Sequence, residues 1–171
     1  MKILKLIPIL FLIFGAYPHR NFIRAEVKNP KDYKVLSTNN KKLSIANVDY
    51  YLKQGDKYLK NGDFAKAKES YLSARKLATR LASFYSDLNT AFIGVDARIP
   101  NEMQNKGRAS LKILAKTNSR LAALYIRNEN ADVAVPLLIE TIRIMTPDSP
   151  EGKEAYKMLM QLGFVETTFR K

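Results

Sequence analysis

The chain has 171 residues, no cysteine, one histidine and a formal net charge of +13. Without cysteine it has no disulfide, no thiolate metal site and no thiol nucleophile, and its single histidine, His19, lies in a segment typical of targeting sequences. Zinc, haem and catalytic-triad chemistry are therefore poor prospects. Glycine and proline are sparse, and alanine, leucine, lysine and glutamate are plentiful, which favours an all-helical domain.

Residues 1–25 predict a signal peptide or an N-terminal anchor. Lys2 and Lys5 precede an apolar run at 6–17, which is shorter than the roughly 20 residues that span a bilayer. We therefore expect an exported or membrane-associated protein (periplasm, thylakoid lumen or membrane periphery) that is not a multi-pass membrane protein. Residues 26–44, with Pro30 and a polar STNN cluster, predict a flexible linker.

Residues 48–80 predict two antiparallel helices joined by a tight turn. In the turn Asn61-Gly62-Asp63, glycine accepts the left-handed conformation and Asp63 caps the next helix. Apolar side chains recur every three or four residues on both helices, and small ones alternate with large ones, so that the helices interdigitate. The positions that we expect to pack in this way are Tyr51, Gly55, Tyr58, Ala67, Tyr71 and Ala74.

This pattern resembles the tetratricopeptide repeat (TPR), whose period of about 34 residues it spans. Gln54 and Thr79 depart from it, at places where the family usually has leucine and proline. A second match follows an Asn128-Glu129-Asn130 turn, with Pro136 predicting a kink or a delayed start in its second helix. Its matching positions are Leu121, Ala122, Tyr125, Ala134 and Leu138.

Two long helices are expected between these matches. An unbroken three-four spacing of apolar residues predicts one helix over 64–93, ended by Gly94. The alternative is a degenerate third repeat that starts near Ala82. A loop at 95–100 precedes a helix at 101–128, with Pro100 and Glu102 in its first turn. Asn118 in the apolar seam of that helix either fixes the register or marks a break.

Ser149-Pro150-Glu151 predicts the start of a last helix, which Gly163 ends. It resembles the solvating helix that follows a last repeat. The predicted fold is thus all-α, with TPR-like antiparallel hairpins in an α-solenoid, long central helices and a C-terminal capping helix. The helical domain is expected at 45–163 and a tail at 164–171.

No catalytic, phosphate-binding or metal-ligand motif stands out, so we expect a non-enzymatic protein without cofactor, metal, small-molecule substrate or nucleic acid. The resemblance implies an adaptor or scaffold that binds another protein, as a helix or an extended peptide, in a concave groove. The groove residues that it implies are Asp49, Leu52, Asp56, Leu59, Lys60, Ser119, Ala123, Ile126 and Arg127.

A basic surface suggests a second function. Residues 26–171 carry 25 basic and 16 acidic side chains, an excess that would attract an anionic membrane. The layout resembles that of small exported TPR proteins of cyanobacteria and plastids, some of which assist photosystem assembly. The alternatives are therefore a membrane-peripheral assembly factor, including one at the thylakoid, and an anionic-lipid-binding protein.

Overall fold

The computed structural model describes residues 43–169. Within this range the chain forms five helices and no strand, which confirms the all-α prediction. The predicted targeting segment, the predicted linker up to residue 42 and residues 170–171 lie outside the described residues. No helix in the described range is both long and apolar enough to cross a membrane. The helices are α1 (Ile45–Lys60), α2 (Phe64–Phe92), α3 (Arg98–Arg127), α4 (Ala131–Met145) and α5 (Pro150–Gln161).

The first hairpin follows the local sequence signals. The side chain of Ser44 caps α1 by accepting a hydrogen bond from the amide of Asn47. Gly62 takes a φ of 77° in the turn, and the Asp63 carboxylate accepts a hydrogen bond from the Lys66 amide at 3.1 Å. Both predicted roles in the turn, for Gly62 and for Asp63, are confirmed.

The predicted long second helix is confirmed, because α2 runs through residues 79–82 without interruption. No local residue stops it before Gly94, whose φ is 82°. The alternative of a separate repeat that starts near Ala82 is therefore wrong.

The third helix begins three residues earlier than predicted. The Asp96 carboxylate accepts a hydrogen bond from the Arg98 amide, the first of the helix, at 2.9 Å, whereas Ala97 at the N-cap makes no capping bond with its side chain. Pro100 is the third helical residue, where no intrahelical amide donor is needed, so Ile99 is helical as well. Glu102 is consequently the fifth residue and pairs with Lys106 instead of lying in the first turn.

Helix α3 continues without a break through Asn118, so the predicted break is excluded. Helix α4 begins at Ala131 and contains Pro136, which excludes the delayed start. Ser149 caps α5 as predicted, and its hydroxyl accepts a hydrogen bond from the Gly152 amide at 2.9 Å. The predicted tail folds back on α5, because the Tyr156 hydroxyl donates to the Thr167 carbonyl at 2.6 Å.

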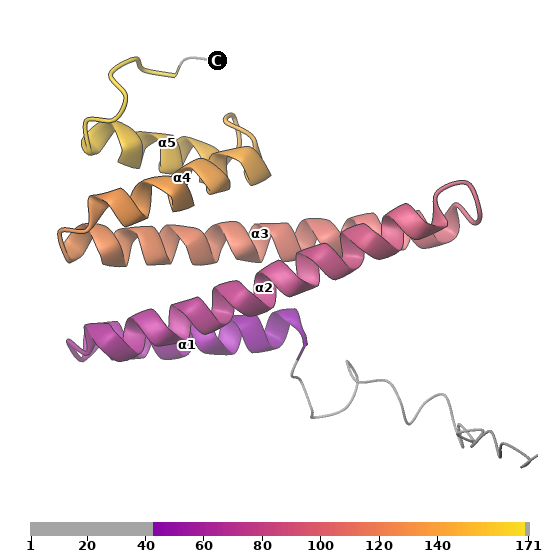
Figure 1. Ribbon diagram of the computed structural model, residues 1–171, viewed down its shortest axis with the longest axis horizontal. Helices are drawn as coiled ribbons and strands as arrows, with labels where there is room; N and C mark the ends of the chain where they lie inside the picture. The colour runs from indigo at the N-terminus through magenta and orange to yellow at the C-terminus, as the bar shows by residue number, and fades with distance from the viewer. Residues whose placement is uncertain (1–42, 170–171) are drawn as a thin grey trace, which may run out of the picture. The chain divides into compact units, whose positions relative to one another are not determined.

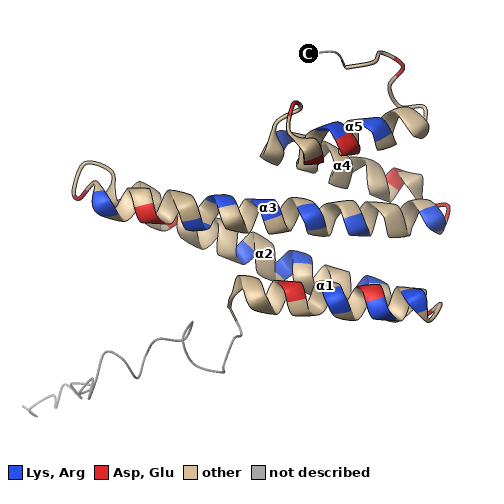
Figure 2. Ribbon diagram, turned by 180° about the vertical axis from the view of Figure 1, so that it is seen from behind, with Lys and Arg blue, Asp and Glu red and all other residues tan. Residues whose placement is uncertain are grey.

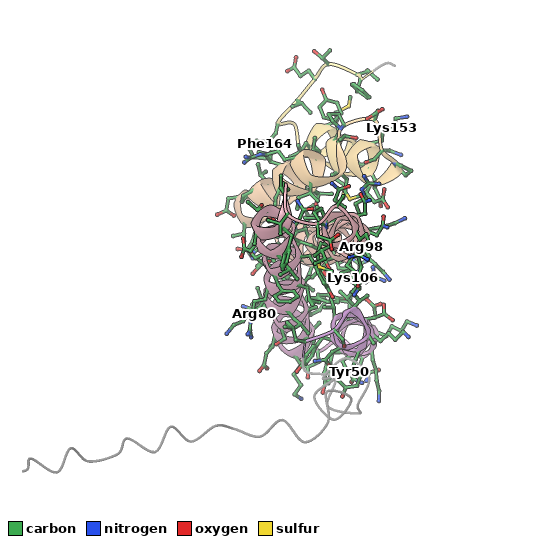
Figure 3. The ribbon with its side chains drawn as sticks, turned by 90° about the vertical axis from the view of Figure 1, so that its right-hand side faces the viewer. Tyr50, Arg80, Arg98, Lys106, Lys153 and Phe164 are labelled. Atoms are coloured by element: carbon green, nitrogen blue, oxygen red, sulfur yellow. The ribbon has the colours of Figure 1, made fainter. Side chains whose placement is uncertain are left out.

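The helices stack in chain order, each against the next, and α3 also contacts α1 and α5. Figure 1 shows α1 beside one half of α2, and α4 and α5 beside one half of α3. The other halves of α2 and α3 extend together as a two-helix projection. Viewed from the projecting end, Tyr50 lies at the α1 end of the stack and Phe164 and Lys153 at the α5 end (Figure 3).

The core lies along the seams between neighbouring helices. The half-buried side chains of Tyr51, Tyr58 and Tyr125 pack against its edge. The remaining positions that the TPR pattern marked for packing are buried: Gly55, Ala67, Tyr71, Ala74, Leu121, Ala122, Ala134 and Leu138.

Three helix ends share one hydrogen-bond pattern. After α1, the Asp63 amide donates to the Tyr58 carbonyl at 2.9 Å. The same bond, across five residues, joins Asn130 to Tyr125 after α3 and Phe164 to Leu159 after α5. The residue before each donor has a positive φ: Gly62, Glu129 and Gly163.

Candidate functional site

The large apolar residues of the predicted groove lie in the core or pack against its edge. Leu52 is only 1% exposed, and Leu59 and Ile126 pack against the core as partly buried side chains. On α1, Val48, Leu52, Gly55 and Leu59 share one face by their helical spacing, and that face lies against α2. The predicted groove of Leu52, Leu59 and Ile126 is therefore corrected: these side chains hold the helices together.

Asp56 is engaged within the molecule. Its Oδ1 accepts hydrogen bonds from the Tyr71 hydroxyl at 2.6 Å and from the Arg120 Nε at 2.8 Å. The Arg120 Nη2 reaches its Oδ2 at 3.1 Å, which completes a bidentate pair between α1 and α3. Burial acts to raise the pKa of Asp56, but the hydrogen bonds from Arg120 and Tyr71 outweigh it and hold that pKa below its usual value.

The same network shifts the pKa values of its two donors. The hydrogen bond to Asp56 raises the pKa of Arg120 above its ordinary value. Burial, followed by the hydrogen bond to Asp56, raises the pKa of Tyr71 well above that of a free tyrosine. All three side chains are therefore held in the protonation states that keep α1 joined to α3.

Asp49 forms a second bridge between the same helices. It pairs with Lys53 at 3.0 Å on α1 and with Lys116 at 3.5 Å on α3. The hydrogen bond from Lys53 lowers the pKa of Asp49. Lys60 and Arg127 are exposed, and Lys60 lines a separate shallow depression at the end of α1.

Two predicted groove residues, Ser119 and Ala123, line an open cleft of about 570 Å³. The cleft lies along α3, and α1 and α5 also contribute residues to its walls. We call it the three-helix cleft. The residues that line it and that the sequence did not indicate are Ile45, Ala109, Lys112, Ile113, Lys116, Arg120, Glu151 and Glu154.

A basic row along α3 is the signal that would have located this cleft. Lys112, Lys116 and Arg120 are spaced four residues apart and so share one helical face. Figure 2 shows Lys and Arg recurring along the whole length of α3. The groove positions that the TPR resemblance implies on α3 begin at Ser119 and do not include this row.

The basic row is matched by acids on both sides of the three-helix cleft. Lys116 and Arg120 pair with the α1 carboxylates, and Lys112 lies 3.7 Å from Glu151 of α5. Glu154 in the wall has no ion pair among the described residues. The cleft therefore combines a small-residue floor with charged edges of both signs.

A second polar network lies on the other side of α3. The Arg75 Nε donates to the Oδ1 of Asn118 at 2.9 Å, and its Nη2 donates to Glu140 of α4 at 2.5 Å. Asn118 is fully buried. Among the described residues, no three His, Cys, Asp or Glu side chains are grouped so that they would hold a metal ion.

Comparisons of the chain with models of protein families, with curated proteins and with solved structures found no match.

Proposed function

We propose that this protein is a non-enzymatic adaptor that binds a segment of another protein in the three-helix cleft, and that its helices form a TPR-like solenoid. The three equivalent helix ends support the solenoid. Gly62 and Glu129 are 67 residues apart and Glu129 and Gly163 are 34 apart, close to two periods and one period of the repeat. In this repeat pattern α5 corresponds to the first helix of a repeat, as α1 and the second half of α3 do.

The observation that carries the proposed function is the position of the three-helix cleft. Its walls come from α1, α3 and α5. The TPR resemblance implies that the first helix of each repeat lines the concave binding surface of the solenoid. Ala109, Ser119 and Ala123 are small, so a polypeptide can approach the backbone of α3 closely. Ile45 and Ile113 offer apolar contact for one aliphatic side chain.

The charged side chains at the edges of the three-helix cleft favour opposite charges on the bound segment. In the Lys112–Glu151 pair the lysine side chain is 72% accessible and the glutamate 26%, and pairs near the surface contribute no more than about 1 kcal/mol. Charges on the partner can therefore replace it at small cost. Glu154 favours a basic side chain on the partner at the α5 edge.

Affinity capture with the tagged chain from native membranes tests this function. Ala123→Arg places a long charged side chain in the three-helix cleft and should remove the captured partner. Asn101→Arg adds the same charge at an exposed position at the start of α3 and should leave capture unchanged. If both variants recover the same proteins as the wild type, the assignment of this cleft is wrong.

The lipid-binding alternative remains a prediction from the sequence. Residues 43–169 carry 18 lysine and arginine and 14 aspartate and glutamate residues, a net charge of +4. Most of the excess charge therefore lies outside the described residues. The helices themselves do not favour an anionic membrane over a protein partner.

A further inference from the structure

The two-helix projection leaves part of its own surface uncovered. Helices α2 and α3 have 29 and 30 residues, whereas α4 has only 15. Figure 1 shows that α4 ends beside the middle of α3, and that α2 and α3 continue past it. Between them, in this projecting half, lies an open cleft of about 440 Å³. We call it the hairpin cleft.

The hairpin cleft continues the surface on which α4 packs. Arg75 and Asn118 mark that surface, because Arg75 bonds both Asn118 and Glu140 of α4. Positions 4, 7, 11 and 14 residues after Arg75 lie on the same side of α2, and all four line the cleft: Thr79, Ala82, Ser86 and Asn89. Positions 7, 11 and 14 residues before Asn118 do so on α3: Leu111, Gly107 and Gln104.

The dimensions of the hairpin cleft suit a short helix. From Thr79 to Asn89 the cleft extends over ten residues, or about 15 Å, which is close to three helical turns. Ala82, Ser86 and Gly107 are small, as helices that pack closely require. A Cβ atom added at Gly107 would lie 3.6 Å from the Cβ of Tyr85, an ordinary van der Waals contact, so a small side chain fits there without a clash.

Two polar groups in the hairpin cleft lack partners among the described residues. The Oδ1 atom of Asn89 is buried and accepts no hydrogen bond. Arg108 is exposed and forms no ion pair. The Asn89 oxygen is already covered by the chain itself, so it does not select a partner, whereas a free guanidinium favours a carboxylate.

We propose that the hairpin cleft is a second docking site, which binds an amphipathic helix of another protein. The bound helix continues the line of α4 along α2 and α3. It presents small and aliphatic side chains to Ala82 and Gly107 and an acidic side chain to Arg108. The hairpin cleft and the three-helix cleft have no lining residue in common, and Gly107 and Lys116, nine residues apart, lie on opposite sides of α3.

The absence of cysteine permits a site-specific test on the full chain. Ser86→Cys carries an environment-sensitive fluorophore in the hairpin cleft, and Asp87→Cys carries it one residue away on an exposed face. The probe is a display library of 16-residue helical peptides with a randomised face, selected on the wild-type chain. Selected peptides should share an acidic residue at a fixed distance from an apolar stripe, and should shift the emission of the Ser86 label alone.

Three variants decide the result. Gly107→Leu fills the hairpin cleft and should weaken peptide binding at least tenfold. Arg108→Glu should weaken the binding of the same peptides, and changing their acidic residue to lysine should restore binding to this variant. This result does not depend on whether Gly107→Leu folds. Ala123→Arg should leave this binding unchanged, so failure here is distinguishable from failure of the three-helix cleft.

Two outcomes would overturn the proposal. The first is that the selected peptides bind the Gly107→Leu and Arg108→Glu variants as tightly as they bind the wild-type chain. The second is a wild-type chain that light scattering shows to be a dimer and that Gly107→Leu converts to a monomer, because the occupant is then a second copy of the chain.

Discussion

Two glycines inside helices should respond to the same substitution with opposite signs. A Cβ atom added at Gly55 would lie 2.3 Å from Cε1 and 2.5 Å from Cδ1 of Tyr71, well inside van der Waals contact. Tyr71 is 1% exposed, and its hydroxyl is bound to Asp56. The ring therefore cannot move aside without disturbing the bridge between α1 and α3.

The size of the effect at Gly55 follows from two opposing terms. Replacing a helical glycine by alanine gains about 1 kcal/mol from helix propensity, and overpacking a core position costs about 1–3 kcal/mol. Because Tyr71 is held at both ends, we take the upper part of that range. Gly55→Ala should thus lower the free energy of unfolding by about 2 kcal/mol.

Gly107→Ala is the matched control, because its new Cβ atom meets nothing closer than 3.6 Å. It should raise the free energy of unfolding by about 0.5–1 kcal/mol. Urea unfolding followed by circular dichroism measures both values, and an unchanged denaturant slope shows that the unfolding transition is comparable.

A double-mutant cycle isolates the contact with the ring. In a Tyr71→Ala background the added Cβ atom meets no ring atoms, so Gly55→Ala should become neutral or stabilising. The coupling between the two positions should then be about 2–3 kcal/mol. Equal effects of Gly55→Ala in both backgrounds would refute the interlocking of α1 and α2 described above.

Three further predictions concern stability. Because the folded pKa of Asp56 is lowered, its carboxylate stabilises the fold above the usual aspartate pKa of about 4 and loses that effect as pH falls through the lower folded value. The Asp56 side chain is 35% exposed, so solvent screening limits the cost of Asp56→Asn to about 1 kcal/mol at pH 7, and this cost should shrink as pH falls. A cost in urea titrations that stays the same from pH 7 to the lowest pH at which the protein is folded would contradict this. Thr146 has φ 70° and ψ 150°, a region that glycine alone adopts readily. Thr146→Gly should therefore stabilise the protein by about 1 kcal/mol in thermal unfolding. A loss of stability would show that the contacts of the Thr146 side chain contribute more than the backbone strain costs. Ser149→Ala removes the cap of α5 and should lower the free energy of unfolding by about 1 kcal/mol, whereas Ser149→Asp should keep most of the capping stabilisation. If both variants lose the same free energy of unfolding in chemical denaturation, capping by Ser149 is not the cause.

Local signals predicted most of the helices because they act within one or two turns of the chain. Gly62 and Gly94 end helices through their own backbone conformation, and Ser149 begins one through a bond to an amide three residues away. The one early start, at Arg98, lies next to Asp96, whose carboxylate binds the Arg98 amide and which the sequence did not single out. Its effect is also local, so it was available in the sequence.

The candidate site was predicted less well, because it depends on which faces of distant helices meet. Ser119 and Ala123 line the three-helix cleft, but Leu52 faces inward. Whether a leucine on an amphipathic helix lines a groove or a core depends on the neighbour that packs over it. The charges of the cleft were hidden for the same reason, since Lys112 and Glu151 are remote in sequence.

The sequence alone determined the all-helical class, the turn at Gly62 and the length of α2, because helix periodicity and capping are properties of neighbouring residues. Only the tertiary structure decided that Asp56 joins α1 to α3, that α5 forms a wall of the three-helix cleft, and that α4 ends partway along the surface of α2 and α3 on which it packs. Each of these depends on contacts between helices whose relative positions arise from packing, and no local pattern encodes how far one helix extends along another.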